Sequence, residues 1–100
     1  MAARRRAVVW ADRARRALDD ALTYIAKDSL QNAGRIAERV IEQANSLATL
    51  SERGRVVPEV GDPVLRELFV DPFRLMYEVR ETEIHIVAFL HQRQIFAPGR

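Results

Sequence analysis

The stretch LRELFVDPFRLMYEVRETEIHIVAFLH, residues 65–91, decides the fold of this chain. Apolar and polar residues alternate along it in three runs, as they do in strands whose two faces meet different surroundings. Asp71-Pro72 and Glu81-Thr82 separate the runs with turn residues. The stretch therefore predicts three consecutive antiparallel strands, the last of which is apolar on both faces and is expected to be central in the sheet. Alternation in this last run predicts that one face holds Ile84, Ile86, Ala88 and Leu90.

Two amphipathic helices precede these strands. A short run of β-branched and aromatic residues, Ala7–Trp10, first predicts another strand. Apolar residues then recur at three- and four-residue intervals over residues 14–25 and again over 33–48. Asp12 is expected to cap or open the first helix, and Asp28-Ser29 to cap the second. Because the helices are joined by about two residues, they should form an antiparallel hairpin.

Residues 51–63, between the second helix and the last three strands, break the helical pattern. Two glycines and two prolines punctuate this segment, so it is interpreted as a loop, with Val56-Val57 holding it to the core. Gly34, within the second helix, is expected to mark a close contact with a neighbouring element. Helices segregated from a mainly antiparallel sheet predict an α+β two-layer sandwich, with residues 1–100 as a single domain.

The composition excludes several classes of protein. The 100 residues are 48% hydrophobic and 30% charged, which is typical of a soluble globular domain. There is no cysteine, which excludes disulfides and thiolate metal sites and is compatible with a reducing, cytoplasmic location. No apolar run approaches the roughly 18–20 residues of a membrane helix, so no membrane partner is expected.

Positive charge gathers at the N-terminal end. The net charge is only +2, but residues 1–16 hold six arginines and one acid. A basic edge favours an anionic partner, either nucleic acid or an acidic protein. A merely solubilising surface is the alternative interpretation.

The candidate chemistry is that of histidine and arginine. The chain has no phosphate-binding glycine loop and no metal-ligand spacing, so neither a cofactor nor a metal is expected. His91 ends the last predicted strand, and Arg93 is expected to share its face. Arg66 and Arg74 lie on neighbouring strands and are expected to converge on the same region. A histidine base with arginines that stabilise charge can cleave a phosphodiester.

The same side chains also have a purely structural interpretation, which the residues alone favour. Arg66 lies beside Glu67 and Arg74 lies near Glu78, so each arginine has an ion-pair partner close in the sequence. Tyrosines 24 and 77 are expected to complete the core rather than to act in catalysis.

Four short motifs follow one another in a characteristic order. They are GRVVPE at residues 54–59, LREL at 65–68, FRLMYEV at 73–79 and IVAFLHQR at 86–93. With the strand and two helices before it, this order resembles the RelE/ParE toxin superfamily of bacterial type II toxin–antitoxin systems. The resemblance spans essentially the whole chain and implies the same fold.

The resemblance implies one of two activities. RelE-like members are ribosome-dependent endonucleases that cut mRNA, whereas ParE-like members inhibit DNA gyrase. The nucleases typically carry lysine-rich or Glu/His/Tyr catalytic sets, but here the single lysine, Lys27, lies between the helices and no tyrosine lies near the C-terminus. Arg74 matches the nuclease arginine that precedes an apolar pair and a tyrosine, and His91 falls near the catalytic position of the terminal strand. The detail is more similar to ParE.

Three functions are therefore carried forward. The first is a gyrase inhibitor that acts by binding and is neutralised by a cognate antitoxin. The second is an mRNA endonuclease with His91 as the base and Arg66, Arg74 and Arg93 stabilising charge; these four residues are also the candidates for binding the target. The third is a non-toxic relative that retains antitoxin binding and autoregulation.

An antitoxin is the partner common to all three functions. Its tail is expected to add a strand to the sheet and to lay a helix in a groove. The candidates for binding it are Arg13, Arg16 and Tyr24. The resemblance implies that operator DNA is contacted through the antitoxin and only weakly by this chain.

Overall fold

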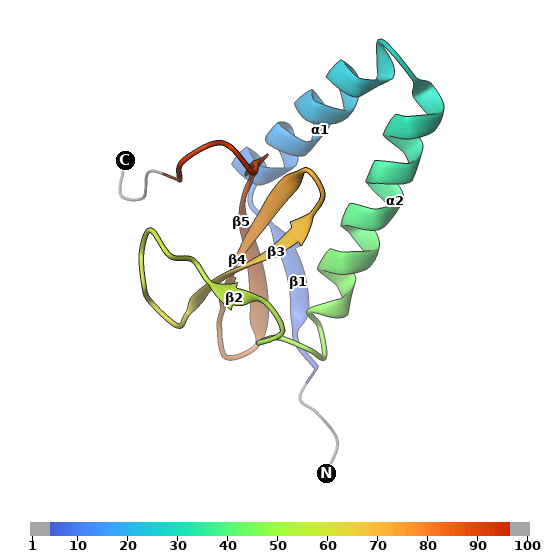
Figure 1. Ribbon diagram of the computed structural model, residues 1–100. Coiled ribbons are helices and arrows are strands. Elements are labelled where there is room, and N and C mark those ends of the chain that lie inside the picture. The colour runs from blue at the N-terminus through green and yellow to red at the C-terminus, as the bar shows by residue number, and fades with distance from the viewer. Residues whose placement is uncertain (1–4, 97–100) are drawn as a thin grey trace.

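Five strands form one mixed sheet in the order β1-β5-β4-β3-β2, with a helical hairpin on one face (Figure 1). The computed structural model describes residues 5–96. The three predicted antiparallel strands are β3, β4 and β5, and β1 pairs with β5 in parallel. The predicted α+β fold is confirmed, and β5 is an interior strand between β1 and β4. The strands are β1 Ala7–Trp10, β2 Arg55–Val56, β3 Leu65–Val70, β4 Phe73–Val79 and β5 Glu83–His91.

The two helices begin where the sequence predicts. Helix α1 spans Asp12–Ala26 and α2 spans Leu30–Ser46. Ser29 caps α2, because its hydroxyl accepts a hydrogen bond from the backbone N–H of Asn32 at 3.0 Å. Asp12 opens α1, where the helix dipole favours an acid in the first turn. Helix α1 packs on β5 and α2 on β3, and the tip of the hairpin projects beyond the sheet (Figure 1).

The main core lies between the hairpin and the sheet. Ala14 of α1 and Ala44 of α2 are fully buried in it, and their small side chains let the helices lie close to the strands. Tyr77 of β4 is the largest side chain that is fully buried. Its hydroxyl accepts a hydrogen bond from the backbone N–H of Gly54 at 2.9 Å, and burial raises the pKa of that hydroxyl. The main core thus fixes the start of β2 as well as the helices.

A second, smaller core lies on the opposite face of the sheet. Its buried members are Val57, Met76 and Ala88, with Leu65, Leu90 and Phe96 packed against them. Val57 comes from the segment after β2 and Phe96 from the segment after β5, so two irregular segments cover this face. The expected anchoring of the loop to the core is confirmed at Val57, whose side chain is fully buried.

A bulge in β5 changes which side chains share a face. Tyr77 pairs with Ile86 and Met76 pairs with Ala88, which leaves Val87 as an extra residue. Ile86 therefore lies in the main core and Ala88 in the second core. The prediction that these two residues share a face with Ile84 and Leu90 is wrong, because one extra residue reverses the alternation along the strand.

The segment predicted as an uninterrupted loop contains the edge strand β2. Arg55 pairs with Glu67, and Val56 pairs with Arg66. The strand is preceded by Gly54, which suggested a break but is required by packing. A Cβ atom at Gly54 would lie 2.5 Å from the carbonyl oxygen of Glu67 and 2.7 Å from the hydroxyl oxygen of Tyr77. The glycine thus lets β2 approach the sheet rather than ending it.

Gly34 does not mark a close contact, and that prediction is wrong. Apart from its own helix, nothing lies within 4 Å of where its Cβ atom would be. Gly34→Ala should therefore raise the free energy of unfolding, by up to about 1 kcal/mol, because alanine favours helix more than glycine does. Urea denaturation measures the change, and Gly54→Ala, which creates a clash, should lower the same quantity. A Gly34→Ala protein no more stable than wild type would contradict an unhindered helical position.

Candidate functional site

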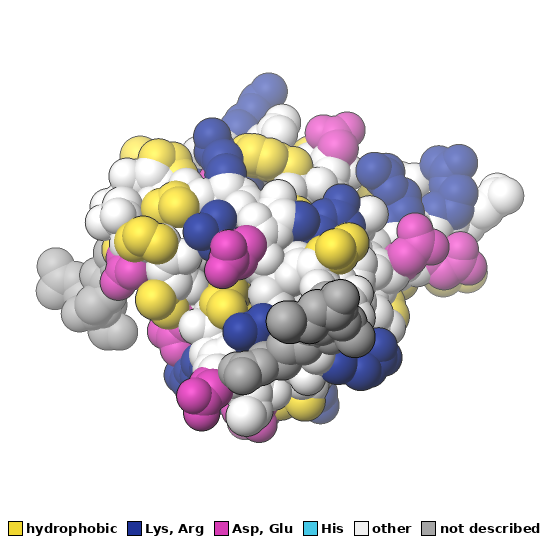
Figure 2. Space-filling model, turned by 90° about the horizontal axis from the view of Figure 1, so that it is seen from below, with side chains coloured by type: hydrophobic (Ala, Val, Ile, Leu, Met, Phe, Trp, Pro, Cys, Tyr) yellow, Lys and Arg dark blue, Asp and Glu magenta, His cyan; other side chains and the backbone are white. Residues whose placement is uncertain are grey.

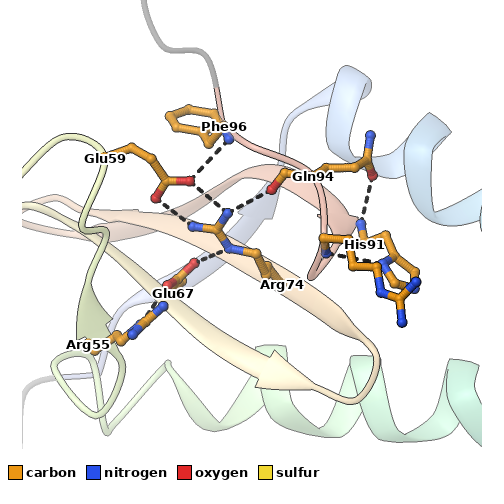
Figure 3. Close-up of polar contacts among 8 residues, drawn as sticks. Arg55, Glu59, Glu67, Arg74, His91, Gln94 and Phe96 are labelled. Atoms are coloured by element: carbon orange, nitrogen blue, oxygen red, sulfur yellow. Dashed lines mark hydrogen bonds and ion pairs between the residues drawn. The ribbon is translucent and has the colours of Figure 1, made fainter.

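Arg74 lies at the centre of a buried network of ion pairs on the face of the sheet opposite the helices (Figure 3). Its side chain is only 6% exposed. Its two Nη atoms each donate to the carboxylate of Glu59 at 2.8 Å, and its Nε donates to Oε1 of Glu67 at 2.7 Å. The planar guanidinium therefore holds one carboxylate in bidentate fashion and a second carboxylate at the same time.

Glu67 connects this arginine to the surface. Its side chain is fully buried, and its second oxygen accepts a hydrogen bond from Nε of Arg55 at 2.6 Å. The guanidinium of Arg55 lies 4.9 Å from the ring centre of Phe69, a cation–π contact. Strand register explains the arrangement, because Arg55 lies opposite Glu67 and Phe69 lies opposite Arg74. A positive, a negative and a positive side chain thus follow one another from the exposed Arg55 on β2, through Glu67 on β3, to the buried Arg74 on β4.

The ion pairs shift the titration of their members. Hydrogen bonds from Arg74 outweigh the effect of burial and lower the pKa of the Glu59 carboxyl from 4.5 to about 2. Hydrogen bonds to Glu59 raise the pKa of Arg74 above its already high value. Both groups are therefore charged at neutral pH, and their charges compensate each other in place.

The same network holds the segment that follows β5. Nη1 of Arg74 donates to the backbone carbonyl of Gln94 at 3.0 Å. The backbone N–H of Phe96 donates to the carboxylate of Glu59 at 3.1 Å (Figure 3). One guanidinium and one carboxylate therefore join the loop after β2, the middle strand of the sheet and the C-terminal segment.

The four candidate target-binding residues do not converge on one region. Arg66 lies opposite Tyr77 in the strand register, on the helix side of the sheet, whereas Arg74 shares the other face with Met76. Arg66 donates to the backbone carbonyls of Pro63 and Gly54, both at 3.0 Å. The predicted convergence of Arg66 with Arg74 is wrong, because successive side chains of a strand point to opposite faces. Arg66 lies opposite Tyr77, and Arg74 lies three residues before Tyr77 on β4, so the two arginines point to different faces.

His91 and Arg93 are close to each other but do not share a strand face. Strand β5 ends at His91, and the chain turns there, so the alternation of side chains between the two faces of the sheet does not extend to Arg93. The backbone N–H of Arg93 donates to Nδ1 of His91 at 3.1 Å, and the imidazole meets the ring of Phe73 edge-on, with centres 6.0 Å apart. His91 pairs with Phe73, one step from Arg74, and so lies on the opposite face from Arg74. The role of each candidate in binding a target stays a prediction.

The ion pairs expected from neighbours in the sequence are also wrong. Glu78 pairs with Arg80 rather than with Arg74, and Glu67 pairs with Arg55 and Arg74 rather than with Arg66. Sequence reasoning missed Glu59 altogether. Its only signal was its place in the motif at residues 54–59, because its partner Arg74 lies 15 residues further along the chain.

The antitoxin-binding candidates lie exposed on α1. Arg13 and Arg16 are exposed, and the side chain of Tyr24 is 71% exposed, with Nζ of Lys27 5.8 Å from its ring centre. The expectation that Tyr24 completes the core is wrong, because the hairpin tip projects beyond the sheet; the expectation for Tyr77 is confirmed. The roles of the three α1 residues stay predictions.

The basic N-terminal segment is in part structural. Nε of Arg6 donates to the carbonyl of Arg80 at 2.7 Å, and its Nη1 donates to the hydroxyl of Ser51 at 2.8 Å. Arg4, which belongs to this basic segment of the sequence, lies outside the described residues. The face seen from below in Figure 2 carries basic and acidic side chains interspersed, so it presents no extended surface of one sign.

A groove of about 310 Å³ lies between α1 and the C-terminal segment. Arg13 and Ala17 line one side of it, and Leu90 and Ile95 line the other. Among residues 5–96, no group of three or more His, Cys, Asp or Glu side chains is placed to hold a metal ion. In the same range no helix combines the length and apolar character needed to cross a membrane.

Comparison with known proteins gives the family. The family described as ParE toxin of type II toxin–antitoxin system, parDE, matches residues 8–96. The chain belongs to this family. The toxin is also 37% identical over 89 residues to the protein named Toxin RelE2 of Caulobacter vibrioides, which is 88% of this chain and 97% of that protein. The resemblance to the RelE/ParE superfamily is therefore confirmed.

A solved structure shares the toxin's fold. The structure titled "Chromosomal ParDE TA system from P. aeruginosa" matches with a TM-score of 0.71, covering 89% of this toxin and 98% of that chain, at 22% sequence identity. The match supports the β-α-α-β-β-β-β order described above. Membership of the family implies that a cognate antitoxin is a partner of the toxin.

Removing Arg74 should destabilise the toxin more than removing an exposed arginine. Arg74→Met leaves the buried Glu67 with Arg55 alone, which should lower the free energy of unfolding by about 3–5 kcal/mol. Arg80→Met, which breaks a half-exposed pair, should cost less than about 1 kcal/mol. Urea denaturation compares the two, and equal losses would contradict the central position of Arg74.

The ion pair of Glu59 predicts a pH dependence of stability. Because folding lowers the pKa of this carboxyl from 4.5 to about 2, its contribution is complete above pH 4.5 and is lost as the pH falls towards 2. The stability difference between wild type and Glu59→Gln should therefore be constant near neutral pH and shrink between pH 4.5 and about 2. Chemical denaturation across this range measures it, and a difference that does not change with pH would contradict the ion pair.

Proposed function

We propose that this toxin inhibits DNA gyrase by binding it, and that a cognate antitoxin neutralises it. The observation that supports binding rather than catalysis is the state of Arg74. A nuclease needs guanidinium groups free to stabilise charge on a phosphate in the transition state. Here Arg74 is buried and its donors point at Glu59, Glu67 and Gln94.

The positions of the other candidates support the same proposal. Arg66 donates to two backbone carbonyls on the helix side of the sheet. His91 lies on that side as well, so a histidine base there would face away from Arg74. A proton-transferring group and its charge-stabilising groups must meet at one reacting atom, and His91 and Arg74 lie on opposite faces of the sheet.

An antitoxin has two kinds of surface to use. β1 is an edge strand, with β5 on one side only, so a partner strand can pair with its free edge. The exposed Arg13 and Arg16 of α1 suit an acidic segment. Operator DNA is then contacted through the antitoxin, and a cytoplasmic location follows from the proposed target.

An mRNA endonuclease is the second candidate. The observation that favours it is the 37% identity to a protein named Toxin RelE2. On this alternative His91 is the base, and Arg93, whose backbone N–H donates to Nδ1 of His91, is among the arginines that stabilise charge. A relative that has lost toxicity is the third candidate, and harmless overexpression of the chain would favour it.

Two assays run in parallel test the proposal. The purified toxin should abolish supercoiling of relaxed plasmid by gyrase, and its antitoxin should restore supercoiling, because binding is reversible. The same preparation should leave mRNA intact on translating ribosomes. Normal supercoiling at excess toxin, together with mRNA cut on translating ribosomes, would reverse the assignment in favour of the endonuclease.

A further inference from the structure

The C-terminal segment, residues 92–96, is held by few contacts after it leaves the sheet. Its first half is fixed by two backbone bonds. The N–H of Gln92 donates to the carbonyl of Pro72, in the turn between β3 and β4, at 2.8 Å, and the N–H of Gln94 donates to the carbonyl of His91 at 2.9 Å in a local turn. Its second half is held by the ion pair. Arg74 donates to the carbonyl of Gln94, and Glu59 accepts from the N–H of Phe96 (Figure 3).

Within this held segment, neighbouring side chains point into different surroundings. Phe96 packs against the second core. Ile95 is 84% exposed, although two backbone bonds fix the residues on either side of it. A single exposed apolar side chain is common on a protein surface, but the backbone bonds on either side of Ile95 fix where this one is presented to a partner. It also lies beside the groove lined by Arg13 and Ala17 of α1, so the position of the segment determines the shape of that groove.

We propose that Glu59 and Arg74 are positioning residues for residues 92–96, and that inhibition of gyrase requires the conformation in which they hold this segment. The inference rests on the proposed function. It gives Arg74 a role in the activity without contact with the target, since the guanidinium is buried and acts through Gln94 and Glu59.

Substitution of Glu59 can test the positioning of residues 92–96 without disrupting the fold of the sheet. It lies in the loop after β2, and its side chain is 23% exposed, whereas Glu67 is fully buried. Without the Glu59 carboxylate, Arg74 still pairs with Glu67, so β3 and β4 remain joined. What is lost is the bond to Phe96 and the tie between the loop and the C-terminal segment.

The test compares Glu59→Ala with Glu78→Ala in the full chain. Glu78 is a matched control, because it also pairs with an arginine but lies away from the segment. In Glu59→Ala the backbone order parameters of Ile95 and Phe96 should fall below about 0.6, and the concentration needed to inhibit gyrase should rise at least about tenfold. Glu78→Ala should change neither quantity, and Glu59→Gln, which keeps one acceptor oxygen, should recover part of both.

A second variant tests the exposed side chain directly. Ile95→Ser should weaken inhibition by a similar factor with an unchanged melting temperature, because the side chain is 84% exposed. If wild type inhibits gyrase and Glu59→Ala is equally potent, the positioning role is overturned, whether or not the segment is ordered. If wild type itself does not inhibit gyrase, the proposed function fails and the positioning role fails with it. The wild-type assay therefore distinguishes failure of the proposed function from failure of the positioning role alone.

Discussion

A buried guanidinium must have all its donors satisfied, and in this toxin that requirement governs one whole face of the sheet. Removing an arginine from water is costly unless carboxylates and carbonyls replace the lost hydration. Arg74 obtains them from three separate segments, at Glu59, Glu67 and Gln94. Within residues 5–96 no helix covers this face, and the irregular segments that do so share the small second core. The ion pairs therefore determine where those segments lie.

The two faces of the sheet are stabilised by different kinds of interaction. On the helix side, burial of side chains from α1, α2 and the strands supplies non-directional stabilisation. On the other side, directional hydrogen bonds to charged groups carry more of the organisation, and these depend on position within tenths of an ångström. The donors of Arg74 are engaged by Glu59, Glu67 and Gln94 on this second face, so this arginine serves structure, which is the basis for proposing that the toxin acts by binding.

The periodicity of neighbouring residues predicted the helices and strands, but it did not predict the contacts between residues that are distant in the sequence. The start of α1 at Asp12, the cap of α2 at Ser29 and the three C-terminal strands follow from periodicity, capping residues and turn residues. The bulge at Val87 could not be predicted, because its effect lies in the register against β4 rather than in its own neighbours. For the same reason the partners of Arg74 were misassigned. Proximity in the sequence favours Glu78 as the partner of Arg74, but Glu59 reaches Arg74 only after the chain has folded back across the sheet.

The parallel pairing of β1 with β5 has a consequence for synthesis of the toxin. Ala7–Trp10 leaves the ribosome before both helices, yet its strand partner, Glu83–His91, leaves after every other strand of the sheet. Until then the first strand has no neighbour in the sheet, since its other edge is free. A nascent chain can form the helical hairpin early but cannot close the sheet. A translation product truncated before β5 would therefore lack the completed sheet, and with it the surface of the folded toxin.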